Sequence, residues 1–146
     1  MPHMRVAYCG IPHVSKDINS RWVKGFVKGS NRPVFARIVD LTRSFYTAIR
    51  NKSYDTAAEL MIQETRLRLE MTPDVLDDTG KKLFDVACAH RCGARFTGAG
   101  GGGCLCAVGG QKEIASLSES WQDILDAVPD AKLLDTRIDP DGILIS

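Results

Sequence analysis

The sequence has no long apolar run, almost no excess of charge and few aromatic residues. No stretch approaches the roughly 20 consecutive apolar residues that a membrane-spanning helix needs, and the N-terminus lacks the basic and then apolar pattern of a secretory signal. The 19 Lys and Arg residues against 18 Asp and Glu residues leave a net charge of +1, which is too small for the basic surface typical of nucleic-acid binding. These absences favour a cytoplasmic protein whose partners are small molecules or other proteins, with no membrane or nucleic acid among them.

The sequence also lacks a disulfide framework, because its cysteines are few and odd in number. The five are Cys9, Cys88, Cys92, Cys104 and Cys106. Two pairs of them, with His13 or His90 nearby, could offer thiolate and imidazole ligands to zinc. Neither pair has the two-residue separation typical of a zinc-binding loop, so we expect buried thiols and no metal site.

The length of 146 residues is that of one ordinary domain. A folded chain of this size buries roughly 70% of the surface that its unfolded form exposes, so one core can hold it together. Residues 1–4 are interpreted as a leader or cloning scar and left out of the expected fold. Residues 5–146 are interpreted as a single domain.

A short strand at residues 5–9 is expected to lead into a block of helices. The first helix is predicted to begin at an Asp17 N-cap and to end at residues 29–31. The second is predicted to carry Pro33 in its first turn, where proline is tolerated. Its apolar residues recur at helical spacing, as in an amphipathic helix.

Two further helices are predicted from the same periodicity. A third begins at Tyr54, and its charged residues are expected to form a solvated face, namely Glu64, Arg66, Arg68 and Glu70. A fourth is expected to start at residues 72–74, which combine a hydroxyl cap, a proline and an acid. Gly93 is expected to end it.

The pattern changes from helices to strands in the last third of the chain. Residues 94–97 and 104–108 are predicted to be strands joined by a glycine-rich turn, followed by a helix at 111–127. Residues 133–138 and 143–145 are predicted to form a closing hairpin. Strands set apart from a block of helices indicate an α+β fold, with an antiparallel sheet of about four strands packed against the helices.

Glycine is concentrated in one segment of the sequence. Eight of the 13 glycines lie between Gly93 and Gly110, and five of them fall in residues 98–103. Such a run is expected where the backbone takes angles barred to other residues or approaches a ligand closely, and bare amides can cradle a phosphate. The segment has neither the ending of a P-loop nor the spacing of a dinucleotide-binding turn. The alternative is a flexible hairpin tip, or a tight turn packed against a helix.

The glycine-rich segment resembles a known family. Residues 93–104, GARFTGAGGGGC, are similar to the third motif of the GHMP small-molecule kinases, which include galactokinase, homoserine kinase, mevalonate kinase and phosphomevalonate kinase. Residues 8–19, YCGIPHVSKDIN, resemble more loosely the segment that begins the C-terminal half of the sugar kinases in that superfamily, above all the heptose phosphate kinases. The resemblance implies the C-terminal α+β domain of such a kinase, a ferredoxin-like layer.

The resemblance also implies roles for particular residues. The third motif borders the phosphates of ATP and of the acceptor in a cleft between two domains. This implies the same role here for Thr97, Gly98, Ala99, Gly100, Gly101, Gly102 and Gly103. His13, Ser15 and Asn19 are candidates for contacts with an acceptor sugar or its phosphate. Arg95 is a candidate phosphate clamp, although in a strand it could simply face solvent.

Two features of the superfamily are missing from the sequence. One is the principal ATP loop, a run like PxxxGLGSSA, and the other is the N-terminal segment with the acidic catalytic residue and the metal ligand. The resemblance therefore implies half of an ATP- and Mg²⁺-dependent sugar kinase, without catalytic residues of its own and inactive alone. The N-terminal half would belong to the same polypeptide or to a separate subunit. Two alternatives are a non-catalytic ligand-binding or regulatory module and an interaction domain.

Overall fold

The structure, a computed structural model, describes residues 2–12 and 16–138, which form a four-stranded sheet and five helices. Along the chain these are β1 (Met4–Tyr8), α1 (Lys16–Lys28), α2 (Arg32–Arg50), α3 (Tyr54–Met71), α4 (Asp78–Ala89), β2 (Gly93–Phe96), β3 (Cys104–Val108), α5 (Gln111–Asp126) and β4 (Lys132–Leu134). Among the described residues, no helix combines the length and the hydropathy that crossing a membrane requires.

The strands lie in the order β2-β3-β1-β4, and each neighbouring pair is antiparallel. β1 therefore lies inside the sheet, while β2 and β3 form a hairpin around the glycine-rich loop. This order, with helices between β1 and β2 and between β3 and β4, is the split β-α-β arrangement of ferredoxin-like folds. The predicted α+β class with a four-stranded antiparallel sheet is confirmed.

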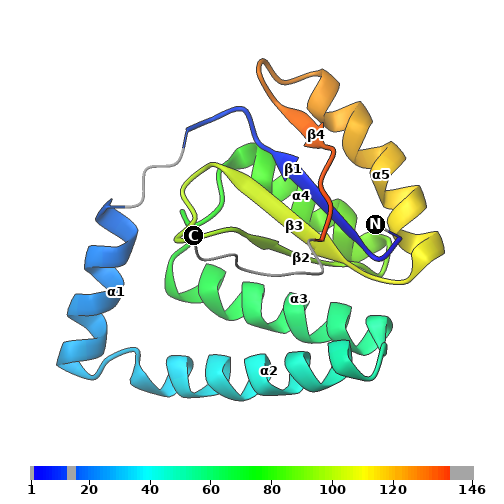
Figure 1. The fold of residues 1–146 in the computed structure, drawn as a ribbon. Coiled ribbons are helices and arrows are strands. Elements are labelled where there is room, and N and C mark those ends of the chain that lie inside the picture. Colours follow the sequence, from blue (N-terminus) through cyan, green and yellow to red (C-terminus); the bar gives the residue numbers. More distant parts are fainter. Residues whose placement is uncertain (1, 13–15, 139–146) are drawn as a thin grey trace, which may run out of the picture.

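One face of the sheet packs against α4 and α5, which lie behind it in Figure 1. Ala7, Phe96 and Leu105 are buried in this layer, each at most 2% exposed. Trp121 of α5 is completely buried there, and its indole N–H donates a hydrogen bond to the carbonyl of Leu83 at 3.0 Å. The buried indole thus has its polar atom satisfied, so it joins α5 to α4 at little desolvation cost.

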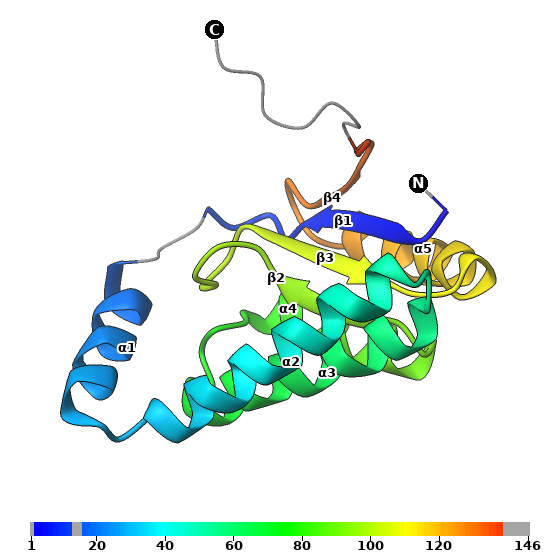
Figure 2. The same cartoon turned by 60° about the horizontal axis from the view of Figure 1, so that its bottom comes forward.

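The edge strand β2 is covered by α3, and α2 packs on α3 (Figures 1 and 2). The hydroxyl of Thr65 donates to the carbonyl of Ala94 at 2.8 Å in a fully buried position. Gly93 permits this approach, because a Cβ there would lie 2.4 Å from the carbonyl oxygen of Ala58. A helix laid along a strand edge satisfies backbone groups that would otherwise be unpaired.

Two of the predicted helix starts are wrong. Asp17 lies within the first turn of α1, which begins at Lys16, so it is not the N-cap. α4 begins at Asp78, and Asp77 is its N-cap, accepting a hydrogen bond from the amide of Gly80 at 2.6 Å. Residues 72–74 instead form a turn, where proline and an exposed acid are also favoured.

The predicted end of α4 is wrong as well. The chain leaves the helix at Arg91, which takes a left-handed φ of 57°, and Gly93 is already the first residue of β2. The predicted charged face of α3 is half correct. Arg66 and Glu70 are exposed, whereas Glu64 is only 7% exposed and the side chain of Arg68 only 11%.

The two ends of the domain also differ from the expectation. β1 begins at Met4 rather than at residue 5, and the ring of His3 stacks on Tyr54 with centroids 3.6 Å apart. The predicted hairpin strand at 133–138 is shorter, since β4 covers Lys132–Leu134 and pairs with β1. Its predicted partner at 143–145 lies outside the described residues.

We predict that Thr65→Val lowers the free energy of unfolding by about 1–3 kcal/mol, because it leaves the buried carbonyl of Ala94 without a donor. Thr47→Val is the matched control, since the hydroxyl of Thr47 is exposed and bonds only within α2, to the carbonyl of Arg43. Urea denaturation of both variants measures the difference. Equal losses would show that the bond between α3 and β2 adds nothing to stability.

Candidate functional site

The glycine-rich loop has the backbone conformation that its sequence predicts. Five of its glycines have left-handed φ values: 71° at Gly98, 81° at Gly100, 77° at Gly101, 109° at Gly102 and 81° at Gly103. Residues with a Cβ rarely adopt these angles. The concentration of glycine is therefore required by the path of the backbone between β2 and β3.

Two distant segments hold the loop in place. The amide of Gly101 donates to the carbonyl of Val75 at 2.8 Å, and the amide of Gly103 donates to the carbonyl of Ile11 at 2.9 Å. The fit is tight, because a Cβ at Gly100 would lie 2.4 Å from the Val75 oxygen. Of the two non-functional interpretations, the packed turn describes this geometry and the free hairpin tip does not.

Other amides of the loop have no hydrogen-bond partner among the described residues. In the described part of the chain, the N–H groups of Gly98 and Gly102 make no hydrogen bond. Thr97 is exposed beside them, and both its amide and its hydroxyl donate to the carbonyl of Cys104, at 2.8 and 3.2 Å. The loop therefore carries backbone donors without partners on a frame that is held by other hydrogen bonds.

The segment beneath the loop is tied to α1. The guanidinium group of Arg21 donates to both carboxylate oxygens of Asp74, at 3.0 and 2.6 Å, and this hydrogen bonding lowers the pKa of Asp74. The indole N–H of Trp22 donates to the hydroxyl of Thr72 at 2.7 Å. These bonds join α1 to the turn that carries Val75, and hence to the loop.

The other residues singled out from the sequence lie in different surroundings. Asn19 is exposed on α1, and its side chain forms neither an ion pair nor a hydrogen bond with the described residues. His13 and Ser15 lie outside the described residues. The side chain of Arg95 is only partly exposed, and it pairs with Glu64.

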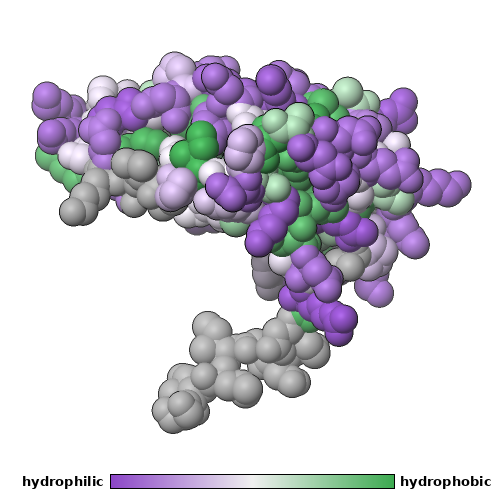
Figure 3. All heavy atoms as spheres, turned by 90° about the horizontal axis from the view of Figure 1, so that it is seen from above, coloured by the Kyte–Doolittle hydropathy of each residue, from purple (hydrophilic) through white to green (hydrophobic). Residues whose placement is uncertain are grey.

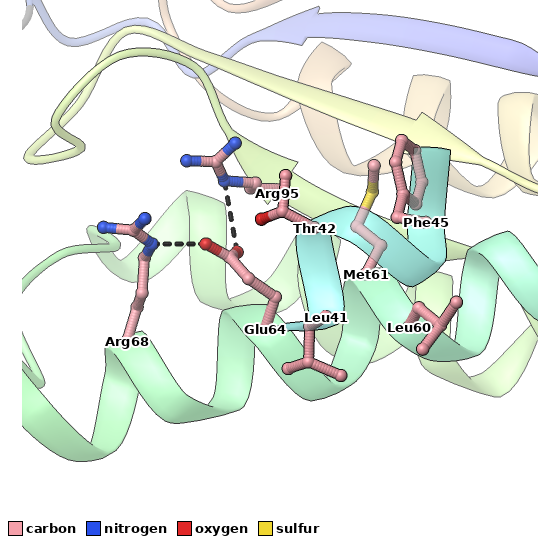
Figure 4. Close-up of a pocket in the computed structure, with 8 residues that line it drawn as sticks. All are labelled: Leu41, Thr42, Phe45, Leu60, Met61, Glu64, Arg68 and Arg95. Carbon is pink, nitrogen blue, oxygen red and sulfur yellow. Dashed lines mark hydrogen bonds and ion pairs between the residues drawn. The ribbon is translucent and has the colours of Figure 1, made fainter. Parts of the chain in front are cut away.

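Glu64 bridges two arginines in a partly closed site (Figure 4). Its Oε1 lies 2.5 Å from Nε of Arg68, and its Oε2 lies 3.2 Å from Nε of Arg95. The guanidinium carbon of Arg68 also lies 4.9 Å from the ring centroid of Trp22 and 5.9 Å from that of Phe96. The four-residue spacing of Glu64 and Arg68 is visible in the sequence. Their burial, however, depends on α1, α2 and β2. The sequence alone therefore predicted that both side chains are exposed to solvent.

A pocket of about 110 Å³ adjoins this cluster. It is lined by Leu41, Thr42 and Phe45 of α2, by Leu60 and Met61 of α3, and by the three charged residues.

The side shown in Figure 3 has apolar residues only in patches separated by hydrophilic ones. That side therefore offers no broad continuous apolar surface of the kind that marks many protein-binding faces.

The expectation of buried thiols holds for Cys9 and Cys92, whereas Cys88, Cys104 and Cys106 are half-buried. Burial raises the pKa of Cys9 and of Cys92 to about 12, and it raises the pKa of Cys88 and of Cys106 as well. Among residues 2–12 and 16–138 no group of three or more His, Cys, Asp or Glu side chains is arranged to hold a metal ion.

Known structures share this fold at low sequence identity. Phosphomevalonate kinase from Streptococcus pneumoniae, in complex with phosphomevalonate and AMPPNP, matches 90% of the chain with a TM-score of 0.74 and 18% identity. The Lin0012 protein from Listeria innocua matches 92% with a TM-score of 0.74 and 17% identity. A second structure of the Streptococcus enzyme matches 90% of the chain with a TM-score of 0.73 and 17% identity. No protein-family model and no curated protein sequence matches the chain.

These matches cover only part of the neighbours. The chain spans 37% of the first kinase chain and 38% of the other two, well under half of each. The five helices and the four-stranded antiparallel sheet of the described residues thus share the fold of the matched part of these structures.

We predict that Gly100→Ala destabilises the domain by about 2–5 kcal/mol, because it adds both left-handed strain and an overlap with the Val75 carbonyl. Gly29→Ala should cost only about 1–2 kcal/mol, since Gly29 has a similar φ of 85° but open space around it. Thermal or urea denaturation of both variants distinguishes the two contributions. An equal loss of stability in the two variants would show that the Val75 carbonyl moves aside at no cost in free energy.

Burial of the thiols predicts a loss of stability at high pH. The unperturbed thiol pKa is 9.0, whereas Cys9 and Cys92 in the folded chain titrate at about 12. The contribution of the two protonated thiols to the free energy of unfolding is complete well below pH 9. It is lost as the pH rises toward 12, because the unfolded state releases protons that the folded state retains. The stability difference between the native chain and Cys92→Ala should therefore shrink between about pH 8 and about pH 10.5 in urea denaturation. A constant difference would contradict the raised pKa.

Proposed function

We propose that this chain is the C-terminal half of an ATP-dependent kinase of the GHMP type, which transfers a phosphoryl group to a hydroxyl of a small metabolite. The observation that carries the proposal is the loop of residues 97–103, with five left-handed glycines fixed between Val75 and Ile11. Support comes from the shared fold with kinases that include an AMPPNP complex.

The loop fits the requirements of phosphoryl transfer. Catalysis of this reaction depends mainly on positioning and on stabilising charge on the phosphoryl oxygens. The open amides of Gly98 and Gly102 could donate to such oxygens without interference from side chains, and their frame needs no reorganisation. The bound Mg²⁺ and ATP would supply the phosphoryl group and neutralise part of its charge.

The remaining parts of the site are assigned to another half. We place the principal ATP loop, the acidic catalytic residue and the Mg²⁺ ligand in an N-terminal half, on the same polypeptide or on a separate subunit. The chain alone would then hold one wall of the cleft and would not turn over substrate.

The acceptor is proposed to be an alcohol of the sugar or sugar-phosphate type, after the resemblance of residues 8–19 to sugar kinases. Of the three candidate contacts in that segment, Asn19 at the start of α1 is the one that lies among the described residues, and it is exposed. The structural neighbours broaden the choice to other phosphorylated alcohols, since one of them is a complex with phosphomevalonate. A galactose-like, a heptose-phosphate-like and a non-sugar acceptor are thus the candidates to compare.

The coding sequence next to this chain gives the first test. An in-frame or adjacent segment with the ATP loop and an acidic catalytic residue is expected. Neither half alone should consume ATP, whereas the two together should do so with one of the candidate acceptors. If no such segment exists nearby, the chain is better described as a ligand-binding or regulatory module.

In that reconstituted enzyme, Gly102→Ala should lower turnover by about 100-fold or more, because its Cβ would press on the carbonyls of Ile11 and Pro12, each 3.0 Å away, and displace an open amide. Gly29→Ala should leave turnover unchanged, because Gly29 also has a left-handed φ, of 85°, but lies outside the loop. Steady-state kinetics of both, with circular dichroism to verify folding, provide the measurement. Similar turnover in the two variants would show that the loop does not contact the reacting groups.

A further inference from the structure

We propose that Trp22 is a positioning residue for the glycine-rich loop, and that it transmits a movement of α1 to the amides of that loop. Its effect on turnover rests on the proposed function, whereas the coupling itself concerns this chain alone. Figures 1 and 2 show α1 at the end of the domain toward which the loop between β2 and β3 points. α1 and the loop therefore lie at the same end of the fold.

The indole of Trp22 contacts three other elements and the turn that follows α3. Its N–H donates to the hydroxyl of Thr72 at 2.7 Å. The guanidinium carbon of Arg68 lies 4.9 Å from its ring centroid, while the ring of Phe35 meets it edge-on at 6.4 Å and that of Phe96 lies at 6.5 Å. Contacts on several sides fix the plane of the indole and hence the direction of its N–H.

Three hydrogen bonds in series lead from this indole to the loop. The first is the bond to the hydroxyl of Thr72. The carbonyl of Thr72 then accepts from the amide of Val75 at 3.0 Å, and the carbonyl of Val75 accepts from the amide of Gly101 at 2.8 Å. Thr72 is 3% exposed and Val75 is fully buried. Hydrogen bonds in such surroundings strengthen one another, so we expect a shift of the indole to reach the backbone of the loop.

Phe96 gives Trp22 a second contact with the loop. Phe96 is the last residue of β2, and a Cβ on Gly100 would approach its ring to 3.1 Å. The indole thus meets both the strand that enters the loop and the turn that holds it.

The amide of Gly102, which the proposed function uses, lies between two tethers. Gly101 on one side is held by the carbonyl of Val75, and Gly103 on the other side by the carbonyl of Ile11. Glycine is conformationally permissive, so these tethers decide where the N–H between them points. The series of hydrogen bonds described above leads to the first tether.

The other end of the coupling is the start of α1. Asn19, a candidate contact of the acceptor, lies three residues before Trp22, so their side chains are neighbours on the helix surface. An acceptor that displaces α1 would move the indole and redirect the N–H of Gly102. The loop would then be placed for phosphoryl transfer only when an acceptor is bound, as in induced fit.

A surface ion pair lies beside this connection. Arg21 and Asp74 also join α1 to the turn, but their side chains are 42% and 63% exposed. Exposed ion pairs are weakened by water and salt. We therefore assign the coupling to Trp22, whose hydrogen-bond acceptor is buried.

The test measures hydrogen exchange of the Gly101 and Gly103 amides by NMR in the 146-residue chain. Trp22→Phe keeps a ring but removes the N–H, and it should speed exchange of Gly101 by about tenfold or more while exchange of Gly103 changes by less than about twofold. Thr72→Val removes the acceptor and should give the same pattern. The double variant should match each single variant, because all three lose one and the same bond.

Trp121→Phe is the matched control. That indole also donates one hydrogen bond, to the carbonyl of Leu83, but it lies in the layer of α4 and α5. Its loss should therefore affect the two glycine amides to the same extent. An equal effect on both amides in Trp22→Phe would show a purely structural role and overturn the proposal. Unchanged exchange of Gly101, or additive effects in the double variant, would overturn it as well.

Turnover provides an independent measurement. In an active enzyme formed with the N-terminal half, Trp22→Phe should lower kcat by about tenfold and leave the KM for ATP within about twofold, because it displaces an amide that acts on the transferred group. Selective exchange of Gly101 in a chain that never gives an active enzyme would refute the proposed function alone. An active enzyme in which Trp22→Phe leaves exchange of Gly101 unchanged would refute the positioning role alone.

Discussion

The contact between α3 and the edge strand β2 determines how the rest of the domain is arranged. Two adjacent residues of the helix meet two adjacent residues of the strand, Thr65 at the Ala94 carbonyl and Glu64 at the Arg95 side chain. One contact is a neutral hydrogen bond and the other an ion pair, and together they fix the register of helix on strand. Since β2 runs directly into the glycine loop, this register also sets where the loop begins.

The loop in turn depends on backbone atoms rather than on side chains. Carbonyl groups of Val75 and Ile11 hold it, so its shape tolerates changes in the side chains of those residues better than changes in its own glycines. The turn of residues 72–74 is itself fastened to α1 through Asp74 and Thr72. The glycine-rich loop, the turn and α1 thus form one hydrogen-bonded unit.

The fold was largely predictable because its signals are local. Alternation and glycine spacing placed β3 at the observed residues and β2 within one residue of its bounds, and the order of elements indicated the α+β class. Helix ends were harder, since a Thr-Pro-Asp turn resembles a helix start, and Arg91 takes a left-handed angle that usually calls for glycine. The buried charges of α3 were missed for a different reason. Whether Glu64 meets solvent is decided by α2 and β2, which no spacing within α3 reveals.

The two hydrogen bonds that hold the loop join it to residues far away in the sequence, and this affects the order in which the domain folds. Ile11 and Val75 both precede the loop in the chain, and Ile11 is separated from Gly103 by nearly the whole helical block. Contacts of such long sequence separation carry a large loop-closure entropy and tend to form late in folding. During synthesis, however, both acceptors emerge from the ribosome before the glycines do. These two hydrogen bonds can therefore form only after the glycines, the last of these residues to be translated, have left the ribosome.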